Sequence, residues 1–211
     1  IDEAKRLGIS ATVDKDDYNY SNSKAILVTS IQTIVNGHSY FGMREAGNYP
    51  IGSIIIDDVH ACMDKIIDQF MIKIDAETDA YKELIALFSS SLKDYNPKNY
   101  IDVVEMKDCR NNMLVPYWEW QRQQDNIYRI LTKYNNSDNT SIYFGLPLIE
   151  RCLETCDCII TASAIEISPK GIDLDKISSL EEASRRIYMS ATLADDSVFV
   201  SALGLDTEDM K

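Results

Sequence analysis

The spacing of apolar residues along the chain separates two kinds of region. Before about residue 74 and after about residue 156, short β-branched apolar runs alternate with helical spacing, which is typical of buried strands joined by helices. The expected strands are 25–29, 51–56, 158–162 and 186–189, and the expected helices are 31–35, 59–73, 174–183 and 195–205. This alternation predicts an α/β fold.

Between about Asp75 and Thr155 only helical periodicity remains, so we expect a mostly helical insertion there. Thr78 or Asp79 is the expected cap of a first helix, which Asn96-Pro97 ends. Two more helices are expected at 115–134 and 142–156, the second with Pro147 near its first turn. The predicted domains are therefore 1–74, 75–155 and 156–211, with the first and last belonging to one α/β unit.

Composition limits the classes of protein. The 211 residues carry a net charge of −13, which is a poor match for a polyanionic partner unless a local groove supplies the cations. No apolar run approaches the roughly 20 residues needed to cross a bilayer, and no charged-then-apolar leader opens the chain. The five cysteines are odd in number, as is common for reduced thiols. We therefore expect a cytoplasmic protein without a membrane partner.

One strand ends in a pair of acids. The run Ser53-Ile54-Ile55-Ile56 leads directly into Asp57-Asp58-Val59-His60, and Ser190-Ala191-Thr192 follows the last expected strand. A buried parallel strand delivers such side chains to the carboxyl edge of an α/β sheet, where nucleotides bind.

Together the two motifs resemble those of superfamily 2 nucleic-acid helicases, of the DEAD/DEAH type, whose motifs read D-E-x-H or D-E-x-D and S-A-T. The resemblance implies a RecA-like parallel sheet with helices on both faces, ATP and Mg²⁺ as cofactors, and DNA or RNA as partner. It assigns Mg²⁺ to Asp57, the attacking water to Asp58, and coupling to His60 and to Ser190, Ala191 and Thr192. The family usually has Glu where Asp58 stands. A helical insertion at this junction is similar to that of the XPD/DinG-like branch.

The sequence lacks a G-x-x-x-x-G-K-[ST] phosphate loop, which this class of ATPase requires. The resemblance therefore predicts a fragment of the first motor domain, inactive alone, with the loop in an upstream part of a longer protein. Thr29, Ser30 and Gln32 follow a strand and open a helix, as the family's motif Ib does, so they are candidates for nucleic-acid contact. An ordinary helix cap explains them equally well.

Other features have a structural interpretation as well as a functional one. Exposed aromatic residues among cations can stack single-stranded bases, but core packing within the insertion also explains them. The residues in question are Tyr117, Trp118, Trp120, Arg122, Tyr128 and Arg129. Cysteines 109, 152, 156 and 158 have the residue types of a metal site, although buried structural thiols are favoured. The alternative function is a non-catalytic interaction module whose insertion recruits a protein partner.

Overall fold

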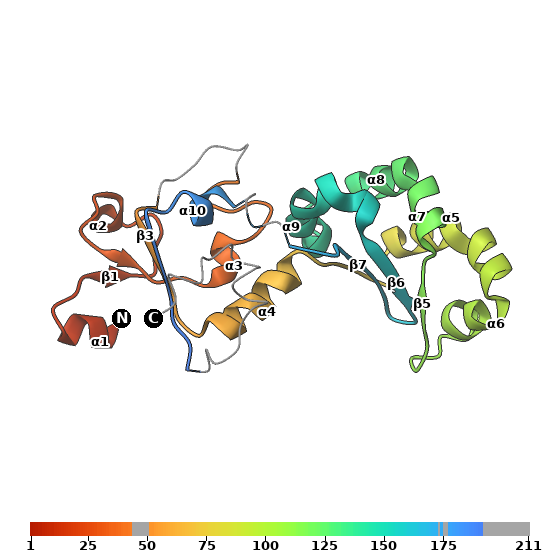
Figure 1. Ribbon diagram of the computed structural model, residues 1–211, viewed down its shortest axis with the longest axis horizontal. Helices are drawn as coiled ribbons and strands as arrows, with labels where there is room; N and C mark the ends of the chain where they lie inside the picture. The colour runs from red at the N-terminus through yellow and green to blue at the C-terminus, as the bar shows by residue number, and fades with distance from the viewer. Residues whose placement is uncertain (44–50, 173, 175–176, 192–211) are drawn as a thin grey trace, which may run out of the picture.

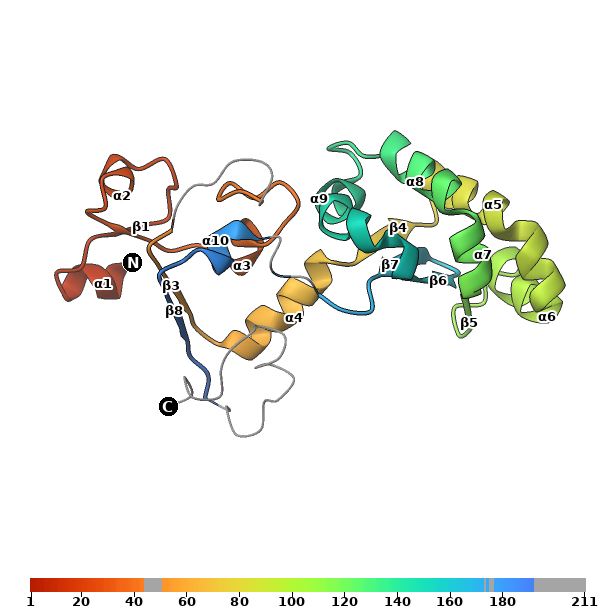
Figure 2. The same ribbon diagram turned by 45° about the horizontal axis from the view of Figure 1, so that its top comes forward.

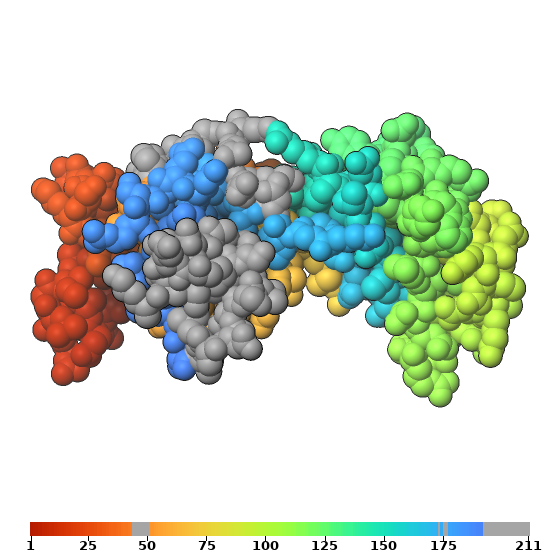
Figure 3. Space-filling view, in the orientation of Figure 1, coloured from red at the N-terminus to blue at the C-terminus, as the bar shows by residue number. Residues whose placement is uncertain are grey.

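The chain folds into two lobes that stand end to end (Figures 1 and 2). The computed structural model describes residues 1–43, 51–172, 174 and 177–191. Helix α4 (Val59–Gln69) runs from the first lobe to the second, and the chain returns after the last strand of the second lobe. The space-filling view places the N-terminal residues at one end of the molecule and α5 and α6 at the other (Figure 3). Both lobes combine helices and strands, so the fold is mixed α/β.

Among the residues that the structure describes, the first lobe has two separate pairs of parallel strands. Its elements are α1 (Asp2–Arg6), β1 (Ala11–Thr12), α2 (Tyr18–Ser21), β2 (Ile26–Leu27), α3 (Ile31–Ile34), β3 (Ser53–Ile56), α10 (Ser178–Glu181) and β8 (Arg185–Tyr188). Strand β1 pairs with β2, and β3 pairs with β8 over four residues, from Ser53 opposite Arg185 to Ile56 opposite Tyr188. The side chains of β3 alternate between exposed and buried, as expected for a strand with one face on a core.

The second lobe is built on a four-stranded antiparallel sheet in the order β4-β7-β6-β5. Its strands are β4 (Ile72–Asp75), β5 (Asn112–Leu114), β6 (Asp157–Thr161) and β7 (Ala164–Ser168). Its helices are α5 (Asp79–Tyr95), α6 (Pro97–Tyr100), η1 (Ile101–Glu105, π), α7 (Tyr117–Arg122), α8 (Gln124–Lys133), α9 (Thr140–Ile149) and η2 (Glu150–Thr155, 3₁₀). Figures 1 and 2 show α5 to α8 gathered at the end of this lobe that lies away from the first lobe.

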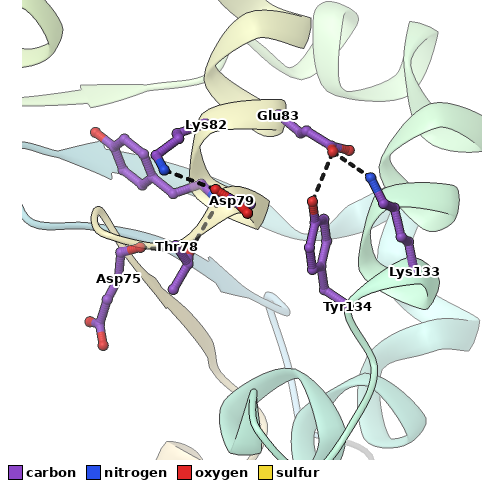
Figure 4. A network of polar contacts seen from close by, with 8 residues as sticks. Asp75, Thr78, Asp79, Lys82, Glu83, Lys133 and Tyr134 are labelled. Carbon is purple, nitrogen blue, oxygen red and sulfur yellow. Dashed lines mark hydrogen bonds and ion pairs between the residues drawn. The ribbon is translucent and has the colours of Figure 1, made fainter.

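Polar contacts fix the start of α5 and join it to α8 (Figure 4). The Thr78 hydroxyl accepts a hydrogen bond from the backbone N–H of Tyr81 at 3.2 Å and donates to the Asp75 carbonyl at 2.7 Å. It therefore caps the helix as the sequence predicts. One turn along, the Glu83 carboxylate accepts from the hydroxyl of Tyr134 at 2.8 Å and from the Lys133 ammonium.

Trp120 anchors the core of the second lobe. Only 2% of its surface is exposed, and its ring centroid lies 6.1 Å from that of Phe88 on α5. The indole N–H donates a 2.7 Å hydrogen bond to the carbonyl of Leu153. Because a buried indole donor needs a partner, this bond fixes the position of η2 against α7.

A close approach at Gly37 joins the lobes. Its N–H donates to the Phe144 carbonyl of α9 at 2.8 Å, and a Cβ placed on Gly37 would lie 2.5 Å from that oxygen. The neighbouring His38 ring stacks on Tyr143 with centroids 3.8 Å apart and planes 10° apart. Glycine is therefore required here by contact between the lobes and not by a turn.

Several sequence predictions need correction. The region expected to be mostly helical also contains β5. The helix expected to reach Lys73 ends at Gln69, since buried Ile72 and Ile74 alternate with exposed Lys73 and Asp75 in β4. The strand expected at 158–162 forms as β6, but it pairs with β5 and β7 and not with β3.

Two helices also differ from expectation. The helix expected over 115–134 breaks at Gln123, whose φ and ψ are −100° and 10°. Helix α9 begins at Thr140, so Pro147 lies inside it and not in its first turn. The helix expected at 195–205 lies outside the described residues. Among the described helices, none combines the length and apolar character that a membrane crossing requires.

Candidate functional site

The acidic motif and Ser190 meet at one edge of the β3–β8 pair. Because the two strands are parallel, their carboxyl ends coincide, and the segments that follow them leave side by side. Two backbone bonds extend the pairing past the strands. The Met189 N–H donates to the Ile56 carbonyl at 2.9 Å, and the Val59 N–H donates to the Met189 carbonyl at 3.0 Å.

A side-chain contact spans this edge. Nδ1 of His60, in the first turn of α4, lies 2.8 Å from Oγ of Ser190. Both side chains are half-buried. The contact therefore joins the start of α4 to the loop after β8. A displacement of one segment would move the other or break the contact.

The two acids of the motif are both exposed. Asp58 occupies the residue before α4 in the left-handed region, with φ 48° and ψ 59°, and its side chain makes no cap hydrogen bond. Its backbone N–H instead donates to Oδ1 of Asp57 at 3.0 Å. A left-handed conformation is costly for a residue other than glycine and is frequent at functional turns. Here it leaves the Asp58 carboxylate free of helix capping.

Cys62 is a neighbour of the site that sequence reasoning did not single out. Its thiol donates to the Asp57 carbonyl at 3.4 Å, and its N–H donates to the Asp58 carbonyl at 3.1 Å. Burial, followed by the negative charges of Asp58 and Asp57, raises the pKa of this thiol. The sequence signal was its place four residues after Asp58 in a helix, which puts it one turn along.

Asp57 carries the kind of oxygen ligand that Mg²⁺ binds in proteins. The described residues contain no group of three or more His, Cys, Asp or Glu arranged to hold a metal ion. Mg²⁺ bound with a nucleotide takes only one or two protein carboxylates, and phosphate oxygens and waters complete its shell. An exposed carboxylate oriented by a backbone N–H has the chemistry for that role.

The candidate nucleic-acid residues lie in the first lobe at the start of α3, which packs against α4. Thr29 and Ser30 are exposed, and Gln32 is half-buried. Ser30 occupies the capping position, but its Oγ makes a 3.1 Å hydrogen bond with the Thr33 hydroxyl and does not cap the backbone.

The remaining candidates separate into core and surface. Ala191 is exposed in the turn after Ser190, and Thr192 lies outside the described residues. Cys156 and Cys158 are buried, Cys109 is exposed, and burial raises the pKa of Cys158. Of the aromatic candidates, Trp120 belongs to the core, whereas Tyr117, Trp118 and Tyr128 are exposed.

Comparison with known proteins yields no relative. No protein-family model matches the chain, and neither does any curated protein or solved structure.

Proposed function

We propose that this chain is part of the first, RecA-like motor domain of a superfamily 2 nucleic-acid helicase, and that the β3–β8 edge belongs to its ATP site. The observation that carries the proposal is the juxtaposition of the two motifs. The D-D-V-H segment and Ser190 lie 130 positions apart and are joined by the His60–Ser190 contact at the carboxyl ends of parallel strands. Such edges are where α/β proteins bind nucleotides.

In this proposal the two acids divide the chemistry of hydrolysis. Asp57 holds the Mg²⁺ that accompanies ATP, which supplies charge neutralisation on the phosphates when bound. Asp58 orients the attacking water, and its left-handed backbone and lack of a capping bond leave its carboxylate available for that task. Its side chain is one methylene shorter than the Glu usual in the family.

In this proposal, His60 and the S-A-T segment link the state of the bound nucleotide to the binding of DNA or RNA. A change at Asp57 or Asp58 alters the start of α4, and His60 passes that change to Ser190 through their hydrogen bond. The proposal assigns the same coupling role to Ala191 and Thr192, which follow Ser190 in the sequence. Thr29, Ser30 and Gln32 provide neutral donors for a phosphate backbone, which suits a chain whose net charge is −13.

Hydrolysis also requires a phosphate loop, and the 211-residue sequence contains no such motif. In this proposal the loop comes from another segment of the protein to which this chain belongs. The assay must therefore use the complete gene product.

The test is ATP hydrolysis by the complete protein with Mg²⁺, with and without single-stranded DNA or RNA. We expect stimulation by one of these nucleic acids and its loss in Asp57→Asn. Asp64→Asn, an exposed acid on the same helix α4, is the matched control and should keep the activity. Folded protein that hydrolyses no ATP under any of these conditions would reject the motor and favour the interaction module.

A further inference from the structure

The far end of the second lobe carries a pocket that the proposed motor function does not use. It has a volume of about 470 Å³ and lies between the end of α5, α6, β5 and the start of α7. These elements lie at the end of the molecule opposite the first lobe, away from β3 and β8 (Figures 1 and 2). Any ligand of this pocket therefore binds at a site separate from the acidic edge.

Three exposed aromatic rings form one wall of the pocket. Trp118 lies between Tyr95 and Tyr117, with ring centroids 5.6 and 5.4 Å apart and interplanar angles of 75° and 82°. Trp118 is 52% exposed, whereas Trp120, two residues along, is only 2% exposed. Exposed aromatic side chains of this kind are the typical anchors of protein-binding surfaces.

Exposed aromatic rings favour a cation. Each ring face carries negative charge density, so a cation that reaches an exposed face of one of these rings is attracted to it. Arginine is the side chain that pairs with such faces most often, because its guanidinium is planar and weakly hydrated.

The lining of the pocket also includes a carboxylate. Asp157, at the start of β6, lines the pocket with Lys170, and its Oδ1 lies 3.8 Å from the lysine Nζ. Both side chains are about half exposed or more, and ion pairs this long and exposed contribute little. An arriving guanidinium can therefore replace Lys170 and bind the carboxylate with two hydrogen bonds. The net charge of −13 also attracts a basic partner and repels a polyanion.

We propose that this pocket binds an extended basic segment of a partner protein, with an arginine side chain held between the Tyr95–Trp118–Tyr117 rings and the Asp157 carboxylate. The inference is independent of the ATP site. Its failure would leave the proposed motor function untouched, because no residue of the pocket belongs to the β3–β8 edge.

The test measures the affinity of the complete protein for a fluorescein-labelled hexapeptide amide that has one arginine among glycines. Fluorescence anisotropy gives the affinity, and the same peptide with glutamine for arginine is the ligand control. We expect Trp118→Ala and Asp157→Asn each to weaken binding of the arginine peptide about tenfold. Tyr128→Ala removes an exposed aromatic on α8 outside the pocket and should change nothing.

Three outcomes would overturn the proposal. The first is an absence of saturable binding of the arginine peptide to the wild-type protein. The second is equal affinity for the glutamine peptide, or undiminished affinity in Trp118→Ala protein that melts at the wild-type temperature. The third is tight binding of a labelled dodecathymidylate that Trp118→Ala abolishes, because the rings would then serve single-stranded nucleic acid.

Discussion

The imidazole Nδ1 of His60 lies 2.8 Å from the hydroxyl oxygen of Ser190, although 130 positions separate the two residues. The whole second lobe is folded between them. Parallel pairing explains this, since the chain between two parallel strands may be of any length provided that it returns to the same sheet. The contact turns two short sequence motifs into one structural site.

Two substitutions at Asp58 should differ in their effect on stability, because the backbone there is left-handed. We predict that Asp58→Asn changes the free energy of unfolding by less than about 0.5 kcal/mol, because Asn tolerates the left-handed region and no capping bond is lost. Asp58→Val should cost about 2 kcal/mol, since a β-branched side chain is strained at φ 48°. Urea unfolding checks both values.

The Asp58→Asn variant also tests the role assigned to Asp58. If the carboxylate orients water, Asp58→Asn protein should be as stable as wild type and yet fail to hydrolyse ATP. A stable Asp58→Asn protein with full hydrolysis would remove Asp58 from the proposed chemistry.

The two tryptophans should respond differently to the same substitution. Trp120→Phe removes the hydrogen bond to Leu153 and leaves a space in the core, so we expect a loss of about 2 kcal/mol in unfolding free energy. Trp118→Phe alters an exposed ring and should stay within about 0.5 kcal/mol of wild type. Guanidinium unfolding followed by circular dichroism measures both, and equal losses would contradict the assignment of Trp120 to the core.

Gly37 should be intolerant of any side chain. A Cβ there would lie 2.5 Å from the Phe144 carbonyl and 2.8 Å from Pro147, so Gly37→Ala must push the lobes apart locally at a cost of about 1–3 kcal/mol. Gly52→Ala is the control, because no atom lies within 4 Å of the added carbon. Thermal melting compares them, and a Gly37→Ala protein as stable as the Gly52→Ala protein would show that the contact between the lobes is not formed.

Glu119 should make the free energy of unfolding depend on pH in the acid range. Its burial opposes ionisation, but hydrogen bonds from Arg122, Ser91 and Gln123 outweigh burial and lower the pKa of the carboxyl. Since the folded pKa lies below the unfolded value of about 4.3, ionised Glu119 stabilises the fold above that pH. This stability is lost as the pH falls through the folded pKa.

The matched variant isolates this contribution. The difference in unfolding free energy between wild type and Glu119→Gln should be greatest near neutral pH and should shrink as the pH is lowered below about 4. Urea titrations across that range measure it. A difference that grows toward acid pH would contradict the prediction that folding lowers the pKa of Glu119.

Helix caps and strand positions could be predicted from the sequence, but the pairing of the strands could not. Thr78 caps α5 as predicted, and strands formed near all four expected positions, because caps and apolar runs are written in neighbouring residues. The pairing of β6 could not be read this way. A run such as 158–162 is equally suited to a parallel or an antiparallel neighbour, and the choice depends on β7, which only two residues separate from β6.

The candidate site shows the same limit. The D-D-V-H and S-A-T motifs are visible in the sequence, but the left-handed backbone of Asp58 and the contact between His60 and Ser190 become visible only in the structure. Core packing was the favoured interpretation of both Trp118 and Trp120, and it is correct for Trp120 but wrong for Trp118, which is exposed.

The most direct test of the account is a double-mutant cycle at His60 and Ser190, measured as nucleic-acid stimulation of ATP hydrolysis by the complete protein. One hydrogen bond is worth about 1 kcal/mol, so His60→Ala and Ser190→Ala should each reduce the stimulation about fivefold. The double variant should be no worse than either single one, because all three lack the same contact. Unchanged stimulation in the single variants, or losses that multiply in the double variant, would contradict the claim that this edge is one coupled site.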